Sequence, residues 1–247
     1  EFVDSDGDSL TDTHEGELGT DPGNSDSDSD GYADGAEVAQ GADPLDADSI
    51  PPPWYVNVNN QSGTEDGTSW ATAFTLVQDG IDAAGAVGGG RVWVAAGTYL
   101  PTVEVFGGPE RADPRRTAFP LQSNVRLYGG FAGTEADADQ RDVRANPTVL
   151  SGDIGVAGEA GDNCYHVVVL DNVMHSRLDG FTISGGEGLR EYELWEGCGA
   201  GIICRSSDAS NIIANCTITG NASTEGGGVY CTGASPAFLD CVFSANT

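Results

Sequence analysis

The chain has 247 residues, with 39 acidic and 10 basic side chains and a formal net charge of −29. Such a charge argues against a nucleic-acid partner, because phosphate backbones are held by clustered Lys and Arg. All ten basic residues are Arg, which excludes a catalytic or Schiff-base lysine. No apolar run approaches the ~18 residues of a membrane helix, so no membrane span is predicted.

Residues 1–50 form an acidic head that contains sixteen acids and no Lys or Arg. Within it, residues 4–15 and 26–37 carry acids at the same positions, 1, 3, 5, 9 and 12 of a twelve-residue unit. This is the spacing of a calcium loop, in which alternate carboxylates, the backbone carbonyl at position 7 and a bidentate Glu surround one hard cation. The predicted ligands of two Ca²⁺ ions are Asp4, Asp6, Asp8, Leu10, Asp12 and Glu15, then Asp26, Asp28, Asp30, Tyr32, Asp34 and Glu37.

The unit repeats every 22 residues, and the copies end in GTDP (19–22) and GADP (41–44). The second loop has Gly31 at the sharp-turn position 6, whereas the first has Ser9 there. The pattern resembles the thrombospondin type 3-like repeats of bacterial surface proteins, and that resemblance implies Ca²⁺-ordered linkers with little secondary structure. The alternative is a disordered acidic tail, but a random tail would not repeat five ligand positions in register. The predicted role of the metal is structural.

Three prolines at 51–53 predict a stiff polyproline II linker between the head and a body formed by residues 54–247. The body consists of short β-type runs separated by Gly, Asn and Asp, which favours an all-β fold. One helical stretch interrupts them, where apolar residues from Phe74 to Ala84 recur at helical spacing. It is predicted to cap one end of a β stack.

Internal repeats predict how the body folds. Residues 178–186, 213–221 and 238–246 align without gaps, as do 199–204 and 226–231. Two strands per unit with apolar alternation and Gly or Asn at the corners describe a parallel β-helix with turns of ~25 residues. The predicted inward ladders are Val167, Ile202 and Val229, and Ile183, Ile218 and Phe243.

The segments GGFAGTE (129–135) and LDGFTISGG (178–186) resemble the right-handed β-helix repeat proteins of environmental bacteria. GGGVY (226–230) with FSAN (243–246) is similar to the repeats of chlamydial polymorphic outer-membrane proteins. These resemblances imply a pectin-lyase-like fold over about residues 54–247. The expected fold class is therefore all-β: a right-handed parallel β-helix with an N-terminal calcium-binding segment and a short capping helix.

The six cysteines fit this stack. The alignments place Cys204 over Cys231 and Cys216 over Cys241 on adjacent coils, with Cα atoms ~5 Å apart and within disulfide range. Cys164 and Cys198 remain and are predicted to form a third disulfide. The alternative is that the thiols stack but never oxidise. Disulfides and calcium loops together predict an extracellular or cell-surface location.

No catalytic residue is assigned. Pectate lyases of this fold use Ca²⁺ held by clustered Asp and an Arg base, which draws attention to Arg177 with Asp153, Asp162, Asp171 and Asp179. None of these forms a spaced motif repeated on neighbouring coils, so enzymatic activity is not the favoured hypothesis. The 185–198 loop concentrates three apolar residues that would suit a sugar ring or a neighbouring subunit, namely Tyr192, Leu194 and Trp195.

The last recognisable coil reaches Thr247 without a capping segment. We therefore expect that the chain continues or that another molecule covers this end. The leading hypothesis is a secreted, calcium-dependent structural or adhesive β-helix protein that self-associates head to tail into an extracellular filament. The alternatives are a polysaccharide lyase or hydrolase of the pectin-lyase-like fold, and a module that binds a cell-surface glycan.

Overall fold

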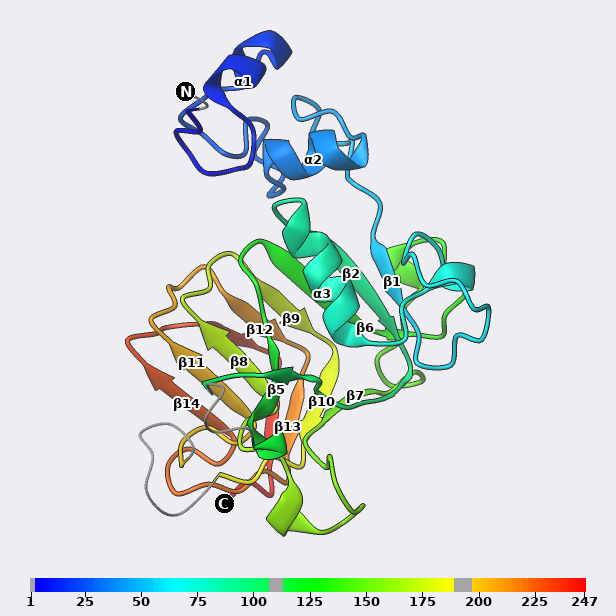
Figure 1. Ribbon diagram of the computed structural model, residues 1–247, viewed down its shortest axis with the longest axis vertical. Coiled ribbons are helices and arrows are strands. Elements are labelled where there is room, and N and C mark those ends of the chain that lie inside the picture. The colour runs from blue at the N-terminus through cyan, green and yellow to red at the C-terminus, as the bar shows by residue number, and fades with distance from the viewer. Residues whose placement is uncertain (1–2, 107–112, 189–196) are drawn as a thin grey trace.

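The computed structural model describes residues 3–106, 113–188 and 197–247 of the protein (Figure 1). It is mostly β, with three mainly parallel sheets and few helices. The described residues form the α-helices α1 (Asp12–Leu18), α2 (Asp34–Gln40) and α3 (Val77–Ala86). The short 3₁₀ helices are Trp70–Thr72, Pro114–Arg116, Ala138–Gln140 and Ala160–Asp162. No described helix is long and apolar enough to cross a bilayer.

The first sheet has six strands, in the order β1 (Trp54–Val56), β2 (Gly90–Ala95), β6 (Val125–Phe131), β9 (Arg177–Asp179), β12 (Ile212–Ala214) and β15 (Ala237–Leu239). The second runs from β16 (Val242–Ser244) through β13 (Thr217–Thr219), β10 (Phe181–Ser184) and β7 (Thr148–Ser151) to β3 (Gly97–Tyr99). The third runs from β14 (Val229–Thr232) through β11 (Ile202–Arg205), β8 (Val168–Asp171) and β5 (Thr117–Pro120) to β4 (Val103–Glu104).

From β6 onward the chain visits the three sheets in a constant rotation. It passes from β6 to β7 and β8, then through β9, β10 and β11, then through β12, β13 and β14, and it ends in β15 and β16. Each new strand pairs parallel to the strand of the previous circuit, and only β4 and β5 pair antiparallel among the named strands. This topology is compatible with a β-helix.

Apolar side chains stack inside the circuits in register. The predicted ladder of Ile183, Ile218 and Phe243 is confirmed by the pairing of β10, β13 and β16. In the other ladder Ile202 pairs with Val229, but its partner on β8 is Val168, so the prediction of Val167 was wrong. Both valines are fully buried, and a run of consecutive buried valines has no alternation that would select the right one.

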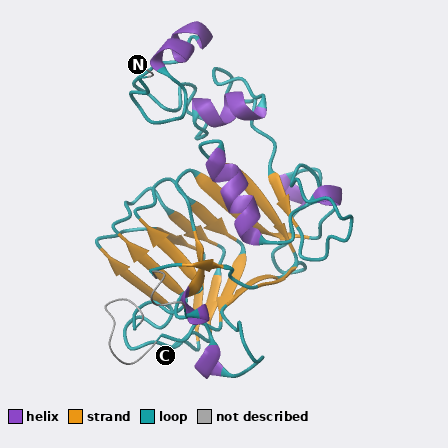
Figure 2. Ribbon diagram, viewed as in Figure 1, coloured by secondary structure: helices purple, strands orange, loops and turns teal. Residues whose placement is uncertain are grey.

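The predicted capping helix is α3, whose buried face includes Val77, Ile81 and Ala84. It packs on β1, β2 and β6, and Figure 2 shows it along the side of the body nearest the head.

The expectation of an all-β protein is corrected by α1 and α2 as well. Each of these helices begins within one acidic loop, at Asp12 or Asp34, and ends at a glycine in the left-handed conformation, Gly19 (φ 94°) or Gly41 (φ 79°). The head therefore has more secondary structure than its resemblance implied, because the loop's own acids begin a helix.

The strand register brings two of the predicted cysteine pairs together. Cys204 lies opposite Cys231, and Cys216 and Cys241 immediately precede the paired residues Thr217 and Val242. A hydrogen bond with the Cys231 thiol and burial raise the pKa of Cys204, while the same bond lowers the pKa of Cys231 to about 7. A thiolate beside a thiol is the reactive form in disulfide formation.

All six cysteines are free thiols in the structure. The Cys164 thiol donates to the His166 carbonyl at 3.1 Å, whereas the Cys198 thiol donates to the Glu225 carboxylate at 3.9 Å. The third predicted pair thus has separate partners, and all three disulfides remain predictions.

Oxidised protein, digested and mapped without reductant, is expected to yield the Cys204–Cys231 and Cys216–Cys241 peptides, because strand pairing holds these thiols side by side. Reduced and alkylated protein is the control. Crossed pairing between the two sets would contradict the strand register, and complete alkylation after oxidation would contradict the disulfides alone.

Candidate metal centre

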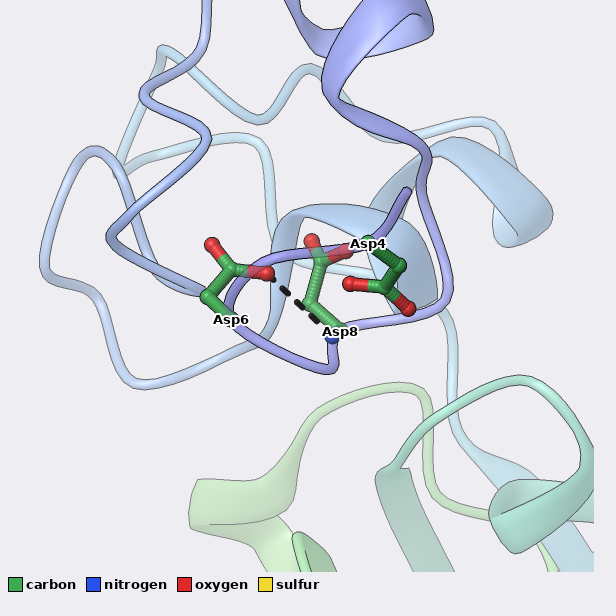
Figure 3. Close-up of side chains that lie close together, drawn as sticks. All are labelled: Asp4, Asp6 and Asp8. Carbon is green, nitrogen blue, oxygen red and sulfur yellow. Dashed lines mark hydrogen bonds between the residues drawn. The ribbon is translucent and has the colours of Figure 1, made fainter. Parts of the chain in front are cut away.

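Two groups of three aspartates converge in the head. Figure 3 shows the side chains of Asp4, Asp6 and Asp8 close together in the first loop. One carboxylate oxygen from each lies within 4.8 Å of the others. The same criterion joins the second-loop aspartates, Asp26, Asp28 and Asp30. The alternate spacing places these side chains together because each loop curls tightly around them. The structure therefore brings together the first three predicted ligands of both loops.

Backbone amides hold these aspartates in a similar way in both loops. Leu10 N donates to Asp8 Oδ1 at 2.7 Å, and in the second loop Tyr32 N donates to Asp30 Oδ1 at 2.7 Å. Leu10 and Tyr32 are both 6% exposed, at the position where a backbone carbonyl ligand is predicted. Ligation by these two carbonyls remains a prediction.

The two loops share one backbone conformation although they exchange Gly and Ser. Position 4 is left-handed in both, with φ 79° at Gly7 and 64° at Ser29. Position 6 is also left-handed, with φ 81° at Ser9 and 91° at Gly31. A left-handed non-glycine residue costs about 1–2 kcal/mol. The serine that departed from the sequence pattern thus adopts the turn that the glycine makes.

The last acid of each loop is completely buried. Glu15 and Glu37 lie in the first turns of α1 and α2, and both are 0% exposed. Neither carboxylate has a hydrogen-bond partner on either oxygen. Buried carboxylates are normally paired or bound to a metal. These four oxygens therefore have the acceptor capacity that a cation would satisfy.

Burial raises the pKa of Glu15 to about 7, and the nearby carboxylates of Asp6 and Asp8 add to this effect. Burial likewise raises the pKa of Glu37 to about 8, with contributions from Asp30 and Asp28. The same aspartates thus lie close enough to each Glu to repel its charge. A divalent ion between them would reverse this repulsion.

The acids at position 9 have a different role. Asp12 accepts hydrogen bonds from the backbone and hydroxyl groups of Ser5, both at 2.9 Å, and Asp34 does the same for Ser27 at 2.8 and 2.7 Å. The structure does not bring these two predicted ligands into the aspartate triads. Their serine partners were not predicted from the sequence, although both loops have a Ser at position 2.

The aspartate triads suit a hard cation. With the predicted bidentate Glu and backbone carbonyl, three aspartate oxygens would complete a set of six oxygen ligands, which is within the range of Ca²⁺. Mg²⁺ demands a tighter octahedron and favours retained water. The head has no Lys or Arg of its own to neutralise these acids, so calcium suits both its charge and its geometry.

The catalytic candidates of the body are engaged elsewhere. Asp179 is 1% exposed and pairs with Arg141 at 2.7 Å and with Arg177 at 2.6 Å, and it also accepts from Asn215. These bonds hold the pKa of Asp179 below its usual range although burial opposes them. Arg177 is thus a partner of a buried carboxylate rather than a free base.

The remaining candidates lie apart from this pair. Asp153 accepts from Gly158 N, and Asp171 lies 3.6 Å from Arg205. Asp162 accepts from Val156 N at 2.7 Å. The apolar residues proposed for a sugar or subunit contact, Tyr192, Leu194 and Trp195, fall outside the described residues.

No family model matches the chain, and no curated protein matches it. Among solved structures, the chain is similar to a "putative glycosyl hydrolase from Parabacteroides merdae ATCC 43184", with 12% identity and a TM-score of 0.32. That match covers 76% of this chain and 95% of the other. A likeness this low carries no argument about function.

Calcium affinity is expected to rise with pH. In the metal-free protein the folded-state pKa values of Glu15 and Glu37 are raised to about 7 and about 8 from the usual 4.5. Metal-free stability is thus highest when both are protonated and falls as the pH rises from about 4.5 to 8. Below these pKa values calcium must displace protons, so affinity should increase up to about tenfold per pH unit for each proton released.

Calorimetric calcium titrations from pH 5.5 to 8.5 would measure this dependence, with Glu17→Gln as a control that removes an exposed acid of α1. An affinity that does not change across this range would contradict the role of the buried glutamates.

Proposed function

We propose that this is a calcium-dependent structural or adhesive protein whose acidic head is ordered by two Ca²⁺ ions. The observation that carries the proposal is the complete burial of Glu15 and Glu37 with all four oxygens unpartnered. Two ions would reduce the head's sixteen negative charges by four and remove the repulsion within each loop. The metal would join the aspartates of each loop to the buried Glu in the first turn of the helix that begins there.

The scaffold that we propose for the body is a right-handed parallel β-helix of the pectin-lyase-like type. The constant rotation through three sheets and the in-register parallel pairing support it. The repeats of the head support the likeness to thrombospondin type 3 repeats. We place the protein outside the cell or on its surface, because calcium is abundant there and the paired cysteines can oxidise.

Self-association is part of the proposal. The last circuit exposes about half of each of three apolar side chains, Leu239 (47%), Val242 (55%) and Phe243 (51%). Phe243 packs edge-on against Phe238, with ring centroids 5.7 Å apart. A head-to-tail contact between copies would generate a filament when its rotation does not close.

Two other classes of function remain. One is an enzyme that cleaves polysaccharide, and the other is a module that binds glycan without cleaving it. The described body residues give them less support, because the buried ion pair engages both Asp179 and Arg177. A cell-surface glycan stays a candidate partner for the adhesive role.

Calcium removal is expected to open the head to proteolysis. A glutamate-specific protease suits this test, because the glutamates of residues 2–50 are Glu15, Glu17 and Glu37, and this segment has no trypsin site. With EGTA we expect cleavage after all three, and with calcium we expect protection of the two buried ones. Trypsin, which cuts only beyond residue 90, serves as the control for the body. Equal cleavage of the head under both conditions would contradict calcium ordering.

Electron microscopy with calcium and with EGTA tests self-association. Filaments are expected with calcium, and Phe243→Ser should reduce them, because it removes apolar surface from the exposed circuit. Thr182→Ser on the outer face of β10 is the matched control. Single particles under both conditions would contradict the filament while leaving the calcium sites untouched.

A further inference from the structure

The second acidic loop is attached to the body by the Tyr32 side chain, which is 6% exposed. The guanidinium carbon of Arg126 lies 4.4 Å from the centre of the Tyr32 ring, and that of Arg91 lies 5.6 Å from it. Arg126 Nη2 also donates a hydrogen bond to the Gly31 carbonyl, and Arg91 Nη2 donates to the Pro51 carbonyl. The head and its linker therefore share two arginines of the body.

These arginines belong to a row on the outside of the six-stranded sheet. Arg91 on β2 is in register with Arg126 on β6, and the next residue in the row is Arg177 on β9. Their neighbours Val92 and Leu127 are fully buried, so alternation along the strand turns the arginines outward. The row is a cationic surface in a chain whose net charge is −29.

The two calcium repeats differ at the residues that make this contact. Where the second loop has Gly31 and Tyr32, the first has Ser9 and Leu10. A Cβ atom on Gly31 would overlap Arg126 Nη2, whereas Ser9 shows that a serine is compatible with the turn itself. The first loop thus has the residues of a calcium loop without the Gly and Tyr that meet the arginines, and it approaches the body at Gly88 instead, through the Asp8 carbonyl and the Ser9 hydroxyl.

We propose that the calcium-loaded second loop is the ligand of the Arg91–Arg126 surface, so that calcium binding docks the head on the body. The inference rests on the proposed calcium function. Gly31 N donates to Asp26 Oδ2 at 2.9 Å and Tyr32 N donates to Asp30 Oδ1 at 2.7 Å. The acidic residues that form the metal site therefore also position the docking residues. Without a cation the carboxylates repel one another, so the folded metal site and the positions of the docking residues Gly31 and Tyr32 are lost together.

Docking and calcium binding must then strengthen each other equally, since coupling between two binding events is reciprocal. A cation–π contact shielded from water is worth enough to change an equilibrium by about tenfold or more. We therefore expect the loss of docking to weaken calcium binding at the second loop by about tenfold. The calcium affinity of the first loop should change less, because Arg126 contacts Gly31 and Tyr32 of the second loop. The first loop is joined to the second repeat through the hydrogen bond from Gly35 N to Asp8 Oδ2.

Three variants of the full chain test the proposal. Gly31→Ser and Tyr32→Leu give the second loop the residues of the first, and Arg126→Gln removes the cation from the body. Arg144→Gln is the matched control, because it removes an exposed arginine that lies away from the head. Calcium titration calorimetry would measure both affinities, and small-angle X-ray scattering with calcium or EGTA would measure the radius of gyration.

We expect the wild type to bind two ions and to become more compact with calcium. The three variants should still bind two ions, one of them about tenfold more weakly, and should remain extended at calcium concentrations that compact the wild type and Arg144→Gln. Unchanged affinities and dimensions in the variants, or a wild type equally compact in EGTA, would overturn the docking while the calcium sites stand. A wild type that binds no calcium would overturn the proposed function itself.

Should Arg126→Gln fail to fold, Gly31→Ser and Tyr32→Leu still test whether the second loop docks on the body, since neither substitution alters the body.

Discussion

The in-register stacking of apolar side chains between successive circuits is the constraint on which the rest of the structure depends. Leu127, Leu178 and Ile213 are paired across three strands and fully buried. Because strand side chains alternate between faces, fixing this inner row also fixes the outer one. The aligned arginines Arg91 and Arg126 are a consequence of that register, as is the meeting of Cys204 with Cys231.

Charge is distributed unevenly between the acidic head and the body, which carries all the basic residues. The head concentrates sixteen acids without a basic residue, and burial increases the cost of its charge at Glu15 and Glu37. The body carries all ten arginines, of which Arg126 contacts the head directly. In the function that we propose, calcium acts within the loops and arginine acts between the parts, and the two are joined at Tyr32.

The repeated spacing of the acids was enough to predict which aspartates converge. Asp4, Asp6 and Asp8 meet as expected, because alternate residues of a tight loop point to one side. The spacing could not show that Asp12 bonds to Ser5, since a carboxylate at position 9 suits a metal or a hydroxyl equally well in sequence. Nor could it show the helices that begin within the loops, because seven residues are too few for a clear helical period.

The sequence by itself determined the mainly parallel strand pairing, the pairing of Ile183 with Ile218 and the capping helix α3, because apolar period and repeat length are local properties of the chain. Only the tertiary structure decided that Val168 rather than Val167 joins its ladder. It also decided that Tyr32 meets Arg126, a residue 94 positions away in the chain. Contacts at such a separation depend on how whole segments pack, and no local pattern of residue types encodes them.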